Sequence, residues 1–471
     1  MKVSEYNIYF DIKCIIYNTL YRNIVFVSSS VYNLLKNKKG KLSTQELTII
    51  SEKCLKKLLN NRIIIDDKLI ENPYECNKYF NYYINEKILY VKLLTTLNCN
   101  LTCSYCYENN KSFNRSKKAK QHNTNLTKQN ATAIILFIEK YAKENKITKF
   151  HISWYGGEPL LNIRIIKYIS KKLISFCKSK KIKYYSDIST NGTLLYKRKV
   201  ISTLKKACVS LIGITIDGDK ENHNKMRTSI TKDKNALYNS IINNIDKLSV
   251  TFNFMIRIML NKNTQNKLDN ILEDFNYIRN KKNLTFFVGG LENIEGCLSK
   301  KKYLQELTLS YLEITKIRST FFYLCSKYNL QGVPETGPLP NSICYALNPS
   351  TFIIAPDLYI YKCPDEIGIN KYQYGKIKIN GIFEKFKNNN YSNFRILNSC
   401  TSCRMLPTCN GGCIFRRLQT NKLECVFKTT DGIEVSNKKI LQDSILSYVY
   451  AQQKGLVPFQ ENNKRFYNEE Q

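Results

Sequence analysis

The chain has 471 residues, of which 43% are hydrophobic and 24% are charged, so it is long enough for about two or three domains with buried cores and is not disordered throughout. Its 73 Lys and Arg residues against 38 Asp and Glu residues give a formal net charge of +35, which favours acidic partners, either nucleic acid or an acidic peptide. An AT-biased coding sequence is an alternative source of this charge, because Lys, Asn, Ile and Tyr are frequent throughout the chain.

The location of the protein follows from its apolar segments and its cysteines. No segment approaches the roughly 20 uninterrupted apolar residues that span a bilayer, and the early charges of Met1–Lys13 argue against a signal peptide. The sequence therefore predicts a soluble, cytoplasmic protein without a membrane partner. In that compartment the 17 cysteines are not expected to form a disulfide framework, and their number is odd. Metal binding is the expected role of clustered cysteines.

Residues 1–85 are predicted to form a small α+β unit. Two or three helices beside short strands are typical of a winged-helix-like module, here interpreted as a peptide-recognition-like module. The predicted strands, from their alternation, are Tyr6–Phe10, Cys14–Tyr17, Asn23–Val27 and Ile63–Ile65. The predicted helices are Val31–Leu35 and Thr44–Leu59, the second opened by a capping box of Ser43 and Glu46.

Strands and helices alternate over residues 86–300, which predicts a parallel sheet closed or partly closed into a barrel. The fold class is therefore α/β, with a partial (β/α)6 TIM-like barrel, and the active site is expected at the carboxyl ends of the strands. The predicted strands are Ile88–Thr95, Lys149–Trp154, Tyr184–Ser189, Val209–Ile216, Phe252–Leu260 and Leu284–Val288. The predicted helices are Thr127–Lys143, Ile163–Ser179, Leu195–Ala207 and Ala236–Leu248.

The remainder of the chain is predicted to hold three parts. Residues 301–340 form a linker or bridging region, in which Gly332–Pro340 is the clearest linker. Residues 341–430 are dense in cysteine and form a C-terminal domain. Residues 431–471 hold a closing helix at Ser436–Gln453 and a frayed polar tail from Glu461.

Three cysteines directly follow the first predicted barrel strand. Cys99, Cys103 and Cys106 form a CX3CX2C motif, and three thiolates in so short a loop can hold three corners of a cubane [4Fe–4S] cluster. The fourth iron is then open to a small molecule. A structural zinc site usually takes four protein ligands, and His is absent nearby. The motif therefore favours an iron–sulfur cluster.

Polar motifs also follow the next three predicted strands. Two glycines in Trp154–Pro159 let the backbone approach a ligand closely, and their backbone groups can meet a ligand's ammonium. Ser189–Gly192 and Thr215–Gly218 present small hydroxyl and amide groups that suit a ribose, and Arg227 suits a carboxylate. Taken singly, each is more often part of a turn.

Together these residues resemble the radical SAM superfamily over about residues 86–290. The resemblance implies that the three cysteines bind a [4Fe–4S] cluster whose open iron chelates S-adenosylmethionine, the source of a 5′-deoxyadenosyl radical. The implied S-adenosylmethionine contacts are Tyr105 at the adenine, Gly156, Gly157, Glu158 and Pro159 at the amino group, Asn191 and Thr215 at the ribose, and Arg227 at the carboxylate. The chain departs from the family at Asn224, where relatives often have Asp, and at Tyr155, where some have Gln.

Seven further cysteines in residues 341–430 exceed any single zinc site, and no His lies between them. Their pattern resembles the SPASM domain, which implies two auxiliary [4Fe–4S] clusters. The resemblance assigns Cys344, Cys363 and Cys413 to the first cluster, and Cys400, Cys403, Cys409 and Cys425 to the second. The remaining ligand of the first cluster is Cys325 or an open site. Leu358 stands where the pattern has Gly, so altered loop geometry is expected there.

SPASM radical enzymes mainly modify peptides and proteins, so the resemblance predicts a peptide maturase. It would form a thioether or another cross-link in a ribosomally made precursor peptide, whose leader the first 85 residues would capture as an added strand. A ferredoxin or flavodoxin-like protein would supply low-potential electrons.

Two alternative functions stay open. An anaerobic sulfatase-maturing, formylglycine-forming enzyme is the nearest, but in that branch an Asp directly follows the second SPASM cysteine. Here Pro364 intervenes, which leaves Asp365 as the one candidate for a catalytic residue. A basic zinc-binding or nucleic-acid-binding protein explains the charge and the cysteines, but not the GGEP motif or the strand-end placement, so nucleic acid is not expected as a partner.

Overall fold

The computed structural model describes residues 1–71 apart from 22, 87–106, 124–229, 237–291, 302–332, 344–386, 403–404, 406–409, 413–415, 445–446 and 449. The chain divides into two compact units. Unit 1 comprises Met1–Tyr82, Thr336–Cys344 and Asn393–Ile445, and unit 2 comprises Tyr83–Glu335, Tyr345–Ser392 and Leu446–Gln471. Residues 341–430, which the sequence groups into one domain, are therefore shared between the units.

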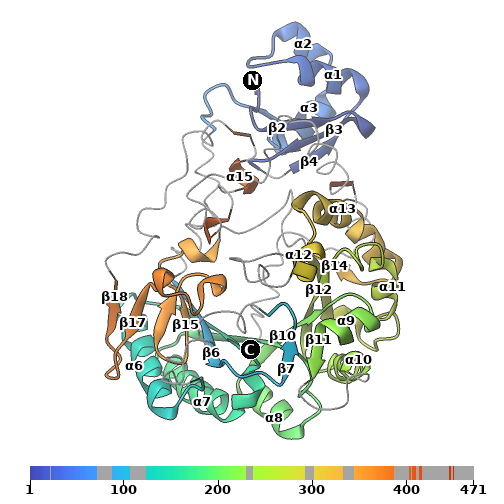
Figure 1. Cartoon of the computed structure of the whole chain (residues 1–471). Helices are drawn as coiled ribbons and strands as arrows, with labels where there is room; N and C mark the ends of the chain where they lie inside the picture. The colour runs from blue at the N-terminus through green and yellow to red at the C-terminus, as the bar shows by residue number, and fades with distance from the viewer. Residues whose placement is uncertain are drawn as a thin grey trace. The chain divides into compact units, whose positions relative to one another are not determined.

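Unit 1 contains a three-stranded antiparallel sheet in the order β2–β3–β4 (Figure 1). Its strands are β2 (Asn7–Phe10), β3 (Ile15–Asn18) and β4 (Asn23–Phe26), and β1 (Lys2–Val3) pairs separately with β5 (Ile64–Ile65). The helices are α1 (Ser29–Asn37), α2 (Thr44–Thr48), α3 (Glu52–Asn60), the 3-10 turn η1 (Ile12–Cys14) and α15 (Leu406–Cys409). Ile16, Val25, Leu35 and Leu58 are buried together in one core, so the predicted strands and helices do pack as one unit.

The segment predicted as one helix at Thr44–Leu59 forms two helices, α2 and α3. The predicted capping box is present, because Glu46 N donates to Ser43 Oγ at 3.2 Å and Ser43 N donates to Glu46 Oε2 at 2.8 Å. Ser51 then acts as a second N-cap, accepting from Cys54 N at 3.4 Å. A capping serine inside a helical pattern offers the backbone an alternative partner, which ends the first helix and starts the next.

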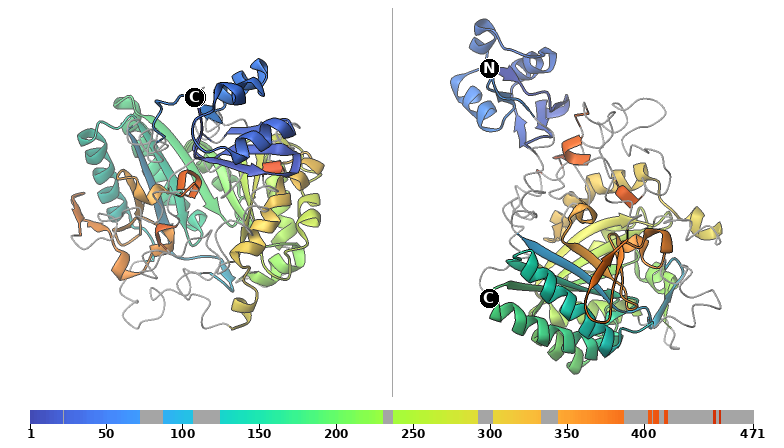
Figure 2. Two further views of the ribbon diagram at one scale, coloured as in Figure 1. Left: turned by 90° about the horizontal axis from the view of Figure 1, so that it is seen from above. Right: turned by 90° about the vertical axis from the view of Figure 1, so that its left-hand side faces the viewer.

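Unit 2 is built on an 11-stranded sheet in the order β14–β13–β12–β10–β9–β8–β6–β15–β16–β17–β18. All six predicted barrel strands are present and parallel, which confirms the α/β class: β6 (Ile88–Thr96), β8 (Lys149–Gly156), β9 (Lys183–Thr190), β10 (Val209–Ile216), β12 (Asn253–Leu260) and β13 (Leu284–Gly290). The predicted helices are α6 (Lys128–Glu144), α7 (Ile163–Ser179), α8 (Arg198–Lys206) and α10 (Leu237–Leu248), and they cover the outside of the curved sheet (Figure 2).

Further strands extend this sheet at both ends. The added strands are β14 (Gln331–Gly332), β15 (Thr351–Ile354), β16 (Tyr359–Tyr361), β17 (Gly375–Ile377) and β18 (Phe383–Lys385), of which β14 and β15 pair in parallel with the barrel and the rest are antiparallel. Gly332, predicted as the first residue of a linker, thus belongs to a strand. The rest of that linker and the tail lie outside the described residues, as does the closing helix apart from three positions.

Short elements complete unit 2. They are β7 (Leu101–Cys103), β11 (Arg227–Ser229), α9 (Lys220–Met226), α11 (Leu268–Glu273), α12 (Lys302–Glu306), α13 (Tyr311–Lys327), and the 3-10 turns η5 (Pro159–Asn162), η6 (Lys281–Asn283), η7 (Tyr345–Leu347), η8 (Pro364–Glu366) and η9 (Asn370–Tyr372). Of the helices in the described part of the chain, none has both the length and the apolar character that crossing a bilayer requires.

The two faces of the sheet differ in character because side chains alternate along a strand. On one face Trp154, Ile188 and Ile214 are buried. The other face carries polar groups, and Asp187 accepts hydrogen bonds there from Ser153 Oγ at 2.7 Å and pairs with His151 Nε2 at 2.5 Å. The carboxyl ends of these strands meet at one edge, where the predicted site residues follow.

Candidate functional site

The loop with the three cysteines is fixed by a segment far along the chain. Its short strand β7 pairs antiparallel with β11, with Cys103 opposite Arg227. Ser104 N donates to Met226 O at 3.0 Å, and Cys106 N donates back to Cys103 O at 3.2 Å. Backbone hydrogen bonds to β11 and within the loop therefore hold the loop in place.

Three free thiols in this loop could each bind one corner of a cluster. Burial raises the pKa of Cys99, and it raises the pKa of Cys103 to about 12 although Arg227 opposes this. All three cysteines stand within eight residues, in the segment that β7 joins to β11. Among the residues that the structure describes, no three ligands converge on a single-ion site. The separate corners of a cubane cluster fit this arrangement, because each thiolate then binds its own iron.

The two glycines of the GGEP motif pack against the start of this loop. Gly157 N donates to Thr96 O at 2.9 Å, and Glu158 N donates to Asn98 O at 2.8 Å. Gly156 has φ +140°, and a Cβ on it would collide with Thr96 O. A Cβ on Gly157 would lie 2.5 Å from Asn98 O. Both positions therefore require glycine for the loop to come this close.

Glu158 ties the end of β8 to the end of β9. Its side chain is fully buried, and its carboxylate accepts from Thr190 Oγ1 at 2.8 Å, from Asn191 N at 2.8 Å and from Leu160 N at 3.0 Å. Burial raises the pKa of Glu158 to about 7, against the effect of these hydrogen bonds. Pro159 follows at the first position of η5, where a missing N–H does no harm. The predicted contact of this motif with the amino group of S-adenosylmethionine stays a prediction.

Asn191 brings the end of β9 to the cluster loop. Its Nδ2 donates to Asn100 Oδ1 at 2.9 Å and lies 3.8 Å from Cys99 Sγ. Thr215 is half-buried at the end of β10, in register with Arg257 of β12. The structure thus places both residues at the predicted strand ends, and their ribose contacts remain predictions.

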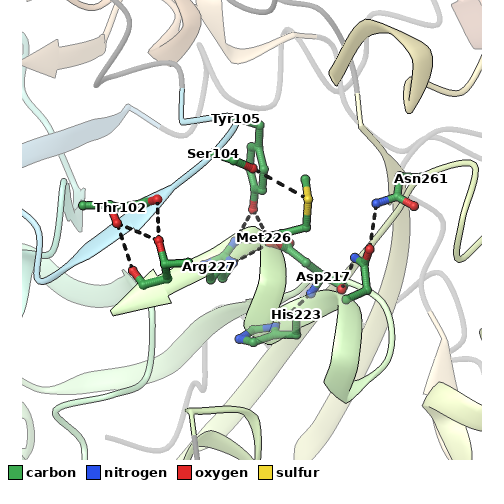
Figure 3. Close-up of polar contacts among 10 residues, drawn as sticks. Thr102, Ser104, Tyr105, Asp217, His223, Met226, Arg227 and Asn261 are labelled. Atoms are coloured by element: carbon green, nitrogen blue, oxygen red, sulfur yellow. Dashed lines mark hydrogen bonds and ion pairs between the residues drawn. The ribbon is translucent and has the colours of Figure 1, made fainter. Parts of the chain in front are cut away.

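Tyr105 and Arg227 meet at Asp217, which follows β10 (Figure 3). Tyr105 Oη donates to Asp217 Oδ2 at 2.6 Å, Arg227 Nε donates to the same oxygen at 2.8 Å, and Arg227 Nη2 donates to Tyr105 Oη at 2.8 Å. Asp217 is 2% exposed, so this ion pair is screened from water. The sequence reasoning included Asp217 in a motif but gave it no role. The one signal in the sequence that could have indicated a role is that an acidic residue directly follows an apolar strand.

A second layer of polar residues holds Asp217 itself. Asp217 N donates to His223 Nδ1 at 3.1 Å, and Asn222 Nδ2 donates to Asp217 O at 2.7 Å. Burial lowers the pKa of His223 to about 4, so the ring is neutral and carries its proton on Nε2. Asn261 Nδ2 in turn donates to Asn222 Oδ1 at 3.2 Å.

The predicted auxiliary-cluster cysteines fall in both units. Cys363 is half-buried beside η8 in unit 2, whereas Cys344 and Cys413 are exposed and Cys403 is half-buried, all three in unit 1. Cys400 and Cys425 lie outside the described residues, and only the backbone of Cys409 is described. Their clusters therefore remain predictions.

Two further sequence expectations concern this region. Cys325 is 1% exposed in α13, and burial raises its pKa well above the usual range, which is the environment of a core thiol. Leu358 has φ +72°, the left-handed conformation that glycine adopts readily. Its N donates to Ala355 O at 3.0 Å, closing the turn between β15 and β16. The turn therefore keeps the conformation that glycine would adopt, with Leu358 strained in it, and the expected change of loop geometry is not seen.

Comparison with known proteins identifies the domain that carries this site. Residues 93–275 match the family model of the Radical SAM superfamily. The cysteine-type anaerobic sulfatase-maturating enzyme of Clostridium novyi (strain NT) is 28% identical over 345 residues, which cover 67% of this chain and 85% of that enzyme. Radical SAM cyclopropyl synthase TigE of Paramaledivibacter caminithermalis is 28% identical over 194 residues, 40% of this chain and 39% of its own.

Solved structures agree on the fold. Native anSMEcpe with bound AdoMet covers 77% of this chain and 99% of its own, with a TM-score of 0.55 and 19% identity. The radical SAM family binds a [4Fe–4S] cluster and S-adenosylmethionine, and the three cysteines after β6 are the predicted donors for that cluster. The chain therefore contains a radical SAM domain with homology to the anaerobic sulfatase-maturating enzymes.

Proposed function

We propose that the protein is a radical SAM peptide maturase that forms a thioether or another cross-link in a ribosomally made precursor peptide. When bound, the cluster and S-adenosylmethionine supply a 5′-deoxyadenosyl radical that takes a hydrogen atom from an unactivated C–H bond. The proposal of a peptide substrate is supported by the N-terminal part of unit 1. This part is a small three-stranded sheet with three helices, and it has its own core.

The edge of that sheet is suited to an extended peptide. Among the described strands of this sheet β4 is an edge strand, and a peptide could pair along it as an added strand. Lys57 of α3 donates to Phe26 O of β4 at 3.0 Å, which places α3 beside this strand. Lys53, Lys56 and Lys57 are exposed on α3. An acidic leader added along β4 would therefore meet a basic helix, in keeping with the net charge of +35.

The proposal includes the cofactors of the predicted C-terminal domain. Two auxiliary [4Fe–4S] clusters would be held by Cys344, Cys363, Cys400, Cys403, Cys409, Cys413 and Cys425. A ferredoxin or flavodoxin-like protein would reduce the clusters.

A formylglycine-forming, sulfatase-maturing activity is the second candidate. The sulfatase-maturating relative of Clostridium novyi favours it, and so does one contact in unit 2. The carboxylate of Asp365 lies 3.9 Å from Cys363 Sγ, although Pro364 separates the two residues. An acid beside the second SPASM cysteine is therefore present in space, where it could act as a base.

The experiment tests leader capture with charge reversal. Lys53→Glu and Lys56→Glu are combined in α3, leaving Lys57 and its contact with β4 intact, and the binding of a precursor encoded by a neighbouring short reading frame is measured. The matched control reverses two exposed lysines of α7, Lys171 and Lys172. We expect binding at least about tenfold weaker in the α3 variant and unchanged in the control, because only α3 would lie beside the leader. Both variants carry the same net charge, so the difference would report the local charge of α3.

Two further arms test the recognition role. Precursor binding by the unmodified enzyme should fall as ionic strength rises from about 0.05 to 0.5 M, where the Debye length shrinks from roughly 14 to 4 Å. Deletion of residues 1–85 should abolish processing of the full precursor, whereas uncoupled cleavage of S-adenosylmethionine survives. Processing that is undiminished by the deletion would contradict the recognition role of residues 1–85.

A further inference from the structure

We propose that Asp217 is a positioning residue for S-adenosylmethionine, because it orients Arg227 and Tyr105 together beside the cluster loop. Tyr105 stands between Cys103 and Cys106 in sequence, so its side chain belongs to the loop that holds the cluster. Arg227 begins β11, which pairs with β7 of the same loop. One carboxylate therefore links the loop to the strand that fixes it (Figure 3).

The carboxylate of Asp217 is held in advance of any ligand. Its backbone N–H and C=O are both engaged, by His223 and Asn222 respectively. Gly218 follows with φ +72°, and a Cβ there would lie 2.6 Å from Thr264 Cγ2, so the turn after β10 has one geometry. The turn leads into α9, which returns the chain to Arg227 within ten positions of Asp217. A rigid acceptor in a buried place is what a positioning group requires.

The geometry also fixes the orientation of both partners. Asp217 Oδ2 accepts from Tyr105 and from Arg227, so the two donors converge on one oxygen. Tyr105 Oη donates to the carboxylate and accepts from Arg227 Nη2 at 2.8 Å. The three side chains are therefore joined in a closed ring of hydrogen bonds. The guanidinium carbon lies 5.9 Å from the centre of the Tyr105 ring. Neither side chain can rotate without breaking two contacts.

The test compares two isosteric substitutions near each other in the chain. Asp217→Asn removes the charge, so the ion pair with Arg227 is lost, and its amide N–H₂ takes the place of one carboxylate oxygen, which leaves one oxygen to accept from Tyr105 and Arg227. Asp219→Asn is the matched control, since Asp219 pairs with Lys267 at 2.6 Å in a more exposed place and Asn still caps α9. Both variants are reconstituted anaerobically, and iron content, S-adenosylmethionine affinity and the electron paramagnetic resonance spectrum of the reduced cluster are recorded.

We expect Asp217→Asn to keep the iron of the control and to bind S-adenosylmethionine at least about tenfold more weakly, with a reduced spectral change on adding it. Tyr105→Phe should weaken binding by a smaller factor, and the double variant should be no weaker than Asp217→Asn alone, because both changes break one network. Affinity within twofold of the control would overturn the proposal. If Asp217→Asn does not hold iron, Tyr105→Phe decides, and unchanged affinity in that variant overturns it as well.

Discussion

A single methyl group on Gly157 should displace the cluster loop. In the structure a Cβ at this position would lie 2.5 Å from Asn98 O and 2.6 Å from Leu97 O. Both atoms belong to the backbone that leads into Cys99, and neither can move aside as a flexible side chain would. Gly157→Ala therefore has to push the loop away from the end of β8 or break the hydrogen bond from Gly157 N to Thr96 O.

The size of the effect follows from these contacts. Overpacking of this kind costs about 1–3 kcal/mol, and loss of the Gly157 hydrogen bond adds about 1 kcal/mol. The strain acts on the loop that holds Cys99, so we expect the cluster there to be lost while the rest of the protein stays folded. Iron measured after anaerobic reconstitution should fall by about four atoms per chain, and 5′-deoxyadenosine formation should fall at least about tenfold.

The matched control is Gly213→Ala in β10, where a Cβ would come no closer than 3.5 Å to Ser189 Oγ, an ordinary contact. This variant should keep its iron and its cleavage of S-adenosylmethionine. A Gly157→Ala variant with full iron and full cleavage would refute the reasoning that close backbone approach is the reason for glycine here.

Three other outcomes are expected. Leu358→Ala should be less stable than Leu358→Gly in chemical denaturation, by about 1 kcal/mol. Both variants lose a side chain that is 4% exposed, but only glycine adopts φ +72° without strain. The opposite order of stability would contradict strain at this turn. The neutral ring of His223, whose pKa is lowered to about 4, should contribute stability that is complete above about pH 6.5 and lost as pH falls toward 4, by up to about 3 kcal/mol. His223→Asn, which keeps an acceptor for Asp217 N, should lack that dependence, and an unchanged slope would assign it to other groups. Unmodified protein should hold roughly 11 to 12 iron atoms per chain after reconstitution, from three cubane clusters, whereas about four with zinc in the remainder would rule out the auxiliary clusters.

The strands and helices of the barrel could be predicted from the sequence because buried parallel strands give runs of apolar residues and the helices between them have a regular period. The break in Thr44–Leu59 was missed because Ser51 fits a helical pattern as an exposed residue, and only the structure shows its side chain capping α3. β14 and β15 were missed since two to four residues give too short a pattern to stand out from a loop.

Part of the candidate site could likewise be predicted from local patterns, and part could not. Cys99, Cys103 and Cys106 are close in sequence, and their spacing alone indicated the cluster. The role of Asp217 depends on Tyr105, which is 112 residues away, and on a turn that returns Arg227 to it. Pairing between such distant side chains is a property of the tertiary fold, which local patterns do not encode. The structural role of Glu158, whose buried carboxylate joins the end of β8 to the end of β9, could not be predicted for the same reason.

The central claim is that the three cysteines after β6 carry radical chemistry on S-adenosylmethionine. The most direct measurement is 5′-deoxyadenosine formed under reducing, anaerobic conditions by a variant with Cys99→Ala, Cys103→Ala and Cys106→Ala. Because these ligands are separate in sequence from the predicted auxiliary set, we expect the variant to keep about two-thirds of its iron and to form none of this product. Product above the level of a blank without enzyme would contradict the assignment of the site.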